Sequence, residues 1–212
     1  MADDALFALI AAERRRLADE LEQLSPADWE QPSLCSGWST HVVAAHLNLP
    51  WSVSSPAFVL GILRARGNID RAMDHFSRRQ AERLDPACCI AGLRAQAEHR
   101  FTPPGFGPEA PLTDVVVHGA DILRPLGRAV DPDPEALRTV LGFVTSPKGR
   151  KGFGAPNLDG VVLQATDVDV TVGAGDEVAS GPALALVAAV LGRRAFTDQL
   201  AGDGVARLTA AG

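Results

Sequence analysis

Apolar residues in the first part of the chain recur at helical spacing. Five of them are separated by three, four or seven positions: Leu6, Ile10, Leu17, Leu21 and Leu24. This spacing places them in one stripe on an α-helix, and such a stripe faces a core. The pattern therefore predicts a first long helix. A short helical turn is expected next, with Ser25 as its N-cap and Pro26 at its first position.

Serine and proline signals divide the following segment into further helices. The expected helices span residues 39–50, 55–83, 86–100 and 111–127. Pro50 is expected to end the first of these, and the pair Ser55 and Pro56 to start the second. Gly127 is an expected helix stop. Four or five helices with short connections predict an up-and-down helical bundle.

The pattern changes near residue 130. After one more helix in 131–144, GVVLQATDVDVTVGAG alternates apolar and polar residues and is rich in Val and Thr, which predicts two strands. SGPALALVAAVLGRR is typical of a helix, and LAGDGVARL of a turn with a short final strand. Residues 145–157 predict a linker, with an anion-binding loop as the alternative. The prediction is an α+β protein, with a helical bundle in 1–130 and a small α/β domain in 131–212.

Composition and charge narrow the class of protein. The chain has 212 residues, 46% of them hydrophobic, which is enough for one good core or two modest ones. Its net charge of -6 disfavours a nucleic-acid partner. The start resembles no signal peptide and no apolar run would span a bilayer, so we expect a cytoplasmic protein without a membrane partner. Three cysteines indicate no disulfide framework.

The segment DVVVHGADILRPLG carries the candidate chemistry. At roughly 100° per residue, Asp114, His118 and Asp121 fall within about 60° of one another, and apolar residues enclose this polar stripe on the helix. Burying two carboxylates and an imidazole is costly unless a metal ion or a dense hydrogen-bond network compensates them. Asp114 and His118 project from adjacent turns toward one point, which is a natural chelating pair.

A histidine from another helix can complete a metal site. In WSTHVVAAHLNLP, His46 shares its helix face with apolar residues that point into the bundle, whereas His41 does not. A site made of His46, Asp114 and His118 leaves open positions for water or substrate, which suits catalytic zinc or non-haem iron. Asp121 is then expected to orient an imidazole or to cap a neighbouring helix.

The same residues also fit interpretations that involve no metal. A histidine on an apolar face is more often a hydrogen-bonded core residue than a ligand, and an Asp and a His four positions apart occur together by chance. Cys88 and Cys89 are expected to be small buried residues, and Cys35 either the same or a reactive loop thiol. Trp38 is expected to act as a hydrophobic staple before its helix.

Two separated motifs and the tail resemble a known family. CSGWSTHVVAAHL and the later DVVVHGADILRPLG resemble the DinB-like superfamily, specifically its mycothiol-dependent maleylpyruvate isomerase branch. The segment from LQATDVDV to GDGVARL resembles the small C-terminal domain of that family, which is similar to sterol-carrier-like α/β domains. The resemblance therefore implies a DinB-like bundle followed by a sterol-carrier-like domain.

The resemblance also implies site residues. The metal ligands of the family fall on His46, Asp114 and His118, although the family pattern has Glu where this chain has Asp114. A basic residue of the C-terminal domain matches Arg193, with Arg194 as the alternative; it would pair with a substrate carboxylate or a developing enolate. The cofactors implied are a divalent metal, zinc above all, and mycothiol. Together with Asp121, Arg193 is a candidate catalytic residue.

The resulting functional prediction is a metal-dependent enzyme of isomerase or S-transferase type. It would use a low-molecular-weight thiol, mycothiol in the first place, on a small electrophilic carboxylate. Arg greatly outnumbers Lys, and Ala and Gly are abundant, as in the GC-rich actinobacterial genomes of mycothiol producers. One alternative is a zinc-dependent hydrolase with Asp121 as general base. The other is a non-catalytic metal-binding module on the same scaffold, and a homodimer is left open.

Overall fold

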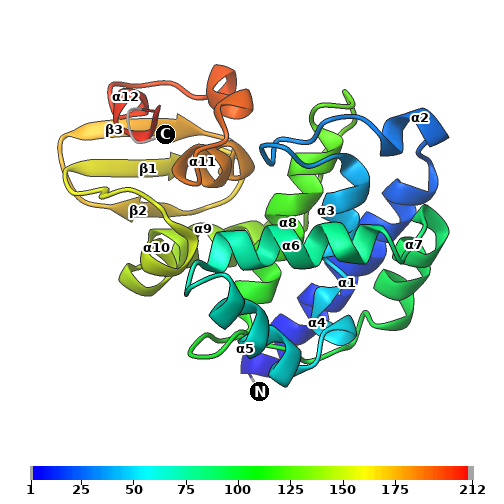
Figure 1. Ribbon diagram of the computed structural model, residues 1–212. Coiled ribbons are helices and arrows are strands. Elements are labelled where there is room, and N and C mark those ends of the chain that lie inside the picture. Colours follow the sequence, from blue (N-terminus) through cyan, green and yellow to red (C-terminus); the bar gives the residue numbers. More distant parts are fainter. Residues whose placement is uncertain (1, 210–212) are drawn as a thin grey trace. The chain divides into compact units, whose positions relative to one another are not determined.

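Two compact units make up the computed structural model, which describes residues 2–209 (Figure 1). The first unit contains the residues up to 102 together with 118–130, and the second contains 103–117 together with the residues from 131 onward. The predicted α+β class is confirmed, because the described residues form many helices and one small sheet near the C-terminal end. The division of the chain into separate domains at residue 130 stays a prediction.

The first unit is helical throughout. Its elements are α1 (Ala2–Glu22), α2 (Pro26–Trp29), α3 (Thr40–His46), α4 (Leu49–Ser52), α5 (Ser55–Arg64), α6 (Ile69–Ala81), α7 (Pro86–Ala95) and the end of α8 (Glu109–Leu123). Helix α1 packs against α7, and α3 packs against both α6 and α7. The predicted apolar stripe of the first helix is confirmed at its centre, since Ile10, Leu17 and Leu21 have no exposed surface. Leu6 is half-buried, and Leu24 lies beyond the end of α1. The predicted helical bundle thus corresponds to a core built around α1, α3 and α7.

Helix boundaries in this unit follow local capping chemistry. The Ser25 side chain accepts a hydrogen bond from the Asp28 backbone, and the Asp28 carboxylate accepts one from Ser25, which is the capping box at α2. The expectation that Pro50 ends a helix was wrong. Helix α3 stops at His46, and Pro50 lies in the first turn of α4, where its missing N–H removes no helical hydrogen bond. The N-cap of α5 is Ser54 and not Ser55.

A buried arginine joins the first helix to the end of α7. Arg14 is only 4% exposed, and its Nη1 donates hydrogen bonds to the backbone oxygens of Ala97 and His99, both at 2.9 Å. Its guanidinium group also lies over the Trp51 ring, 5.3 Å from the ring centre. Ala97 and His99 lie in the segment that follows α7, so Arg14 satisfies carbonyl groups that belong to no helix.

The second unit combines a small sheet with helices. Besides the Glu109–Val117 part of α8, its elements are α9 (Pro134–Thr145), α10 (Pro147–Phe153), β1 (Val161–Ala165), β2 (Thr171–Gly173), β3 (Glu177–Gly181), α11 (Ala183–Val190), the 3-10 helix η1 (Arg194–Gln199) and α12 (Val205–Thr209). The strand order is β2-β1-β3; β1 runs antiparallel to β2 and parallel to β3. Every residue of α11 is buried, and this helix packs on β1, β3 and α9.

Two predictions for the second unit were wrong. The expected linker at 145–157 contains α10, which begins at a Ser146 cap and ends at Gly154 in the left-handed conformation. The expected final strand is limited to an isolated bridge between Ser180 and Ala201. Gly202, with a φ of 101°, turns the chain away from the sheet, and residues 205–209 then form α12.

The role of Arg14 gives a stability prediction. We expect Arg14→Met to lower the free energy of unfolding by about 2–4 kcal/mol, because the buried carbonyl of Ala97 and the partly buried carbonyl of His99 would lose their donor. Arg15→Met is the matched control: Arg15 makes an exposed ion pair with Glu98, and its loss should cost less than about 1 kcal/mol. Urea unfolding of both variants measures the difference. Equal losses would contradict the capping role.

Candidate metal centre

Three predicted ligands converge in the structure. His46 lies in the last turn of α3, and Asp114 and His118 lie one turn apart on the continuous helix α8. One ligand atom of each lies within 4.8 Å of one ligand atom of the other two. Donor atoms bound to the same zinc ion at about 2.1 Å are at most about 4.2 Å apart, so only small side-chain movements separate the observed arrangement from a chelating one. We call these three residues the candidate metal centre.

The hydrogen bonds of His46 determine which nitrogen can bind a metal. Its Nδ1 lies 3.0 Å from Oγ of Ser77 on α6, and that hydroxyl donates its hydrogen to the Met73 backbone oxygen at 2.7 Å. Because the hydroxyl proton is committed to a carbonyl, Ser77 Oγ accepts from His46, and the imidazole proton resides on Nδ1. This tautomer carries its lone pair on Nε2, the form in which a histidine binds a metal.

A buried carboxylate determines which ring nitrogen of His118 carries the proton. Nδ1 of His118 lies 3.0 Å from Oδ2 of Asp121, whose side chain is buried. An imidazole that donates its Nδ1 proton to a carboxylate presents Nε2 to a metal and becomes a stronger donor. Asp121 therefore lies where the sequence placed an imidazole-orienting acceptor, and its side chain is directed at a ring nitrogen.

Cys35 is a third partner of this network, and sequence reasoning missed it. Its thiol donates to Oδ2 of Asp121 at 3.1 Å, and its Sγ lies 3.5 Å from Nδ1 of His118. The neighbouring Leu34 N–H donates to the backbone oxygen of Asp121 at 3.0 Å. The loop before α3 is thus attached to α8 by both backbone and side chain. A single cysteine in a loop gives no sequence signal for such a contact.

Trp38 forms a wall beside the two imidazoles. Its ring centre lies 5.2 Å from that of His46 and 6.4 Å from that of His118. The indole Nε1 donates to Asp74 at 2.8 Å, and hydrogen bonds from Trp38 and Arg78 hold the pKa of the Asp74 carboxyl below its usual range. The indole is therefore fixed by a carboxylate on α6, and the staple role expected from the sequence stays a prediction.

The donor set fits a divalent metal. Two imidazole Nε2 atoms and one carboxylate match the three-ligand pattern of catalytic zinc sites, which keep a further position open. Cys35, His118 and Asp121 form a second group whose atoms also lie within 4.8 Å of one another. Hydrogen bonds within that second group already account for the positions of its atoms. The first group is therefore the better candidate for holding the ion.

The two predicted arginines belong to the second unit. Arg193 follows α11 in the second unit, where its Nη1 donates to the Leu191 backbone oxygen at 2.8 Å; Arg194 is exposed and its Nη2 donates to Thr209 at 3.1 Å. A catalytic role for either arginine stays a prediction.

The two adjacent cysteines differ in their surroundings. Burial raises the pKa of the Cys89 thiol to about 12, whereas Cys88 is exposed, contrary to the expectation that both are buried.

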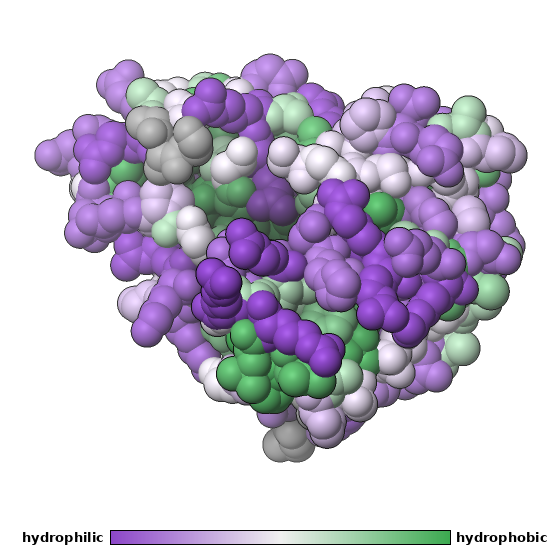
Figure 2. All heavy atoms as spheres, viewed as in Figure 1, coloured by the Kyte–Doolittle hydropathy of each residue, from purple (hydrophilic) through white to green (hydrophobic). Residues whose placement is uncertain are grey.

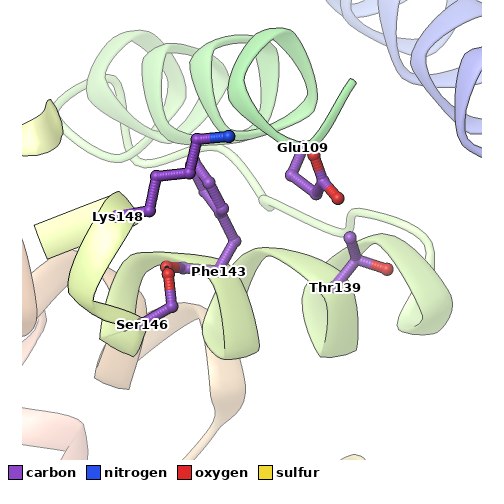
Figure 3. Close-up of a pocket in the computed structure, with 5 residues that line it drawn as sticks. All are labelled: Glu109, Thr139, Phe143, Ser146 and Lys148. Carbon is purple, nitrogen blue, oxygen red and sulfur yellow. The ribbon is translucent and has the colours of Figure 1, made fainter. Parts of the chain in front are cut away.

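A separate hollow in the second unit offers no comparable chemistry. Its volume is about 440 Å³, and Figure 3 shows its lining side chains from the start of α8, from α9 and around the start of α10: Glu109, Thr139, Phe143, Ser146 and Lys148. The Lys148 ammonium group lies over the Phe106 ring, 5.6 Å from its centre. One acid and one base with an aromatic ring form no metal-binding group, so this hollow is not part of the candidate metal centre.

The fold and the site define an α+β protein whose helical part carries a candidate centre of two histidines and one aspartate. Residues 10–100 match the family model of the mycothiol maleylpyruvate isomerase N-terminal domain. This match supports the family that the motif in residues 35–47 resembles. No helix among residues 2–209 is long and apolar enough to cross a membrane.

Solved structures share the fold of the whole chain. A crystal structure of the mycothiol-dependent maleylpyruvate isomerase is similar with a TM-score of 0.53 and 17% sequence identity, covering 94% of this chain and 92% of that one. The structure of a histidine-to-alanine mutant of the enzyme is similar with a TM-score of 0.52, at the same identity and coverage. No curated protein matches the chain. At this identity the likeness establishes the fold.

The hydrogen bond from His118 to Asp121 gives a prediction about metal affinity. We expect Asp121→Asn to weaken zinc binding by about 10- to 100-fold, because the amide is a poorer acceptor for the Nδ1 proton and can present its N–H₂ group instead. Competition with a chromophoric zinc chelator measures the affinity. Glu109→Gln, in the hollow of the second unit, is the control and should leave it unchanged.

The two overlapping ligand groups make opposite predictions for Cys35. If the candidate metal centre holds the ion, Cys35→Ala keeps near-stoichiometric zinc and His46→Ala loses it. Metal retained by His46→Ala and lost by Cys35→Ala would instead assign the ion to the cysteine group. Elemental analysis of both purified variants decides between the groups, and circular dichroism confirms that each variant is folded.

Proposed function

We propose that this protein is a metal-dependent enzyme that uses a low-molecular-weight thiol, mycothiol in the first place, in an isomerase or S-transferase reaction on a small electrophilic carboxylate. The observation that carries the proposal is the paired orientation of His46 and His118. Each imidazole has its Nδ1 occupied by a hydrogen-bond acceptor, which leaves Nε2 for a metal, and one ring nitrogen of each histidine lies within 4.8 Å of an Asp114 carboxylate oxygen. The family of the N-terminal part and the shared fold support the same proposal.

Each residue has a defined task in this proposal. His46, Asp114 and His118 would hold a divalent ion, for which zinc is the proposed identity given the nitrogen and oxygen donors. When bound, such an ion lowers the pKa of a coordinated thiol so that it is a thiolate at neutral pH. Ser77 and Asp121 keep the two imidazoles in the metal-binding tautomer and orientation.

Arg193 is the proposed partner of the substrate carboxylate. A guanidinium group binds a carboxylate through two parallel hydrogen bonds and also stabilises negative charge that develops on an enolate. Its Nη1 donates a hydrogen bond to the Leu191 backbone oxygen at 2.8 Å, and a guanidinium group carries five N–H donors in all. This assignment rests on the resemblance of LGRR to the family pattern.

The hydrolase alternative is less well supported by the geometry. It requires a general base near a metal-bound water, and Asp121 is the candidate for that task. The Asp121 side chain is buried, and its Oδ2 accepts hydrogen bonds from Cys35 and His118. These contacts favour an orienting role for this carboxylate.

The cytoplasm, where low-molecular-weight thiols are kept reduced, is the proposed location of the protein.

Metal content tests the first part of the proposal. We expect near-stoichiometric zinc in protein purified without an affinity tag, and loss of that zinc in His46→Ala and in His118→Ala, because two ligands cannot replace three at this site. His75→Ala is the matched control, because His75 is an exposed histidine on α6. Absence of zinc or iron in wild-type protein, even after reconstitution, would refute the metal-dependent enzyme.

Thiol dependence tests the second part. Turnover of maleylpyruvate or a related unsaturated carboxylate should require added mycothiol and should fall at least about 1,000-fold in Asp114→Ala, as expected when a metal-bound nucleophile is lost. Arg193→Ala should raise KM for the carboxylate substrate more than it lowers kcat, whereas Arg194→Ala should do neither. Activity without any thiol would favour the hydrolase instead.

A further inference from the structure

A groove lies between α5 and α6 in the first unit. The two helices approach closely at Gly61, where an added Cβ would clash with the Phe76 ring, and Phe58 stacks on Phe76 with ring centres 6.0 Å apart. The groove beside this contact has a volume of about 630 Å³. Sites for small molecules commonly have volumes of roughly 300–1,000 Å³. The groove is therefore large enough for a ligand.

The rim of the groove is strongly basic. Its lining includes five basic side chains and no acidic one: Arg64, Arg71, His75, Arg79 and Arg83. Within residues 2–209, none of the four arginines forms an ion pair with an acidic side chain. Neighbouring like charges on one helix repel one another, and an anion placed among them would remove that repulsion. We call this feature the arginine groove.

The floor of the arginine groove is apolar. Val53, Leu60 and Phe76 contribute to it, and Leu60 is 45% exposed. Next to the groove on α5, Val59 and Leu63 are 56% and 68% exposed. Figure 2 shows an apolar patch at the lower edge of this face with strongly hydrophilic side chains directly above it. An apolar surface bordered by unpaired cations is complementary to a molecule with a hydrocarbon part and an anionic head.

The arginine groove is distinct from the candidate metal centre. Arg71, His75 and Arg79 are spaced four residues apart and line one face of α6. Ser77, which holds His46, lies about 160° around the helix from the middle of that face. Helix α6 therefore separates the two features, and no residue of the groove has a role in the proposed reaction.

We propose that the arginine groove binds a single-chain amphiphilic anion, with a carboxylate or phosphate head held by the guanidinium groups and a hydrocarbon chain lying along the floor formed by Val53, Leu60 and Phe76. Guanidinium groups bind both heads through paired charge-assisted hydrogen bonds. The hydrocarbon chain gains affinity by leaving water together with the exposed apolar side chains of α5.

Titration calorimetry with soluble probes tests this proposal. Octyl phosphate and octanoate should bind the full-length, metal-loaded protein saturably with one molecule per chain. Affinity should rise about two- to fourfold for each methylene added from the hexyl to the decyl compound, as expected for burial of each CH₂ group. Inorganic phosphate tests the head alone, and 1-octanol tests the chain alone; each should bind at least tenfold more weakly than octyl phosphate.

Paired charge variants show whether the groove itself is responsible. Arg71→Ala/Arg79→Ala should weaken octyl phosphate binding at least tenfold, whereas Arg138→Ala/Arg207→Ala removes the same charge from exposed arginines of the second unit and should leave it unchanged. Equal weakening in both double variants would show nonspecific charge attraction and overturn the proposal. Octanol binding as tight as octyl phosphate, or binding only to anionic vesicles, would also overturn it.

The groove proposal can be tested independently of the proposed enzymatic function. Arg71→Ala/Arg79→Ala should retain the zinc content of the wild type, because neither arginine belongs to the candidate metal centre. Loss of zinc in this variant would mean that its binding defect reflects damage to the fold, and Arg64→Ala/Arg83→Ala then provides the second test of the groove. Failure of this second variant to weaken octyl phosphate binding would also overturn the proposal.

Discussion

A buried carboxylate is the constraint around which the centre of the molecule is organised. Asp121 has no exposed surface, and a charge in such a place is tolerated only when donors surround it. The donors come from two directions: the Cys35 thiol from the loop before α3, and His118 Nδ1 from one turn earlier on α8. Satisfying this one side chain therefore fixes the position of a loop, a helix and an imidazole at the same time.

The two imidazoles of the candidate metal centre are held by chemically different partners. Ser77 offers a neutral hydroxyl oxygen to His46, whereas Asp121 offers a carboxylate to His118. Since a hydrogen bond to a carboxylate raises the basicity of the opposite ring nitrogen, His118 is the stronger electron donor of the pair. The two hydrogen-bond acceptors also come from different elements: the partner of His46 lies on α6, whereas the partner of His118 lies on the same helix as His118.

The parts of this site that follow a local period could be predicted from sequence, and the parts that depend on tertiary contacts could not. Asp114, His118 and Asp121 share one helix, so their common face follows from helical geometry alone. Ser77 and Cys35 lie in segments far from their histidine partners along the chain, and a single serine or cysteine carries no pattern. They become visible only when the helices are packed.

The same distinction explains the errors in secondary structure. Long amphipathic helices such as α1 were predicted because many positions contribute to one stripe. Helix α10, with the sequence PKGRKGF, contains two glycines among seven residues, and its Ser146 cap outweighs that composition. Strand β3, EVASG, was missed because it has few β-branched residues and is held by its parallel pairing with β1.

The shorter acidic side chain of this chain is compatible with the packing of the histidines. Where the related pattern has glutamate, Asp114 reaches less far from α8, so a shared ion requires both imidazoles to lie close to that helix. They do: the rings of His46 and His118 meet edge to face with their centres 4.9 Å apart, and the carboxylate lies within 4.8 Å of their ligand atoms. Aspartate also has one rotatable bond fewer than glutamate, so fixing it costs less conformational entropy. Its shorter reach is thus accompanied by a more rigid carboxylate.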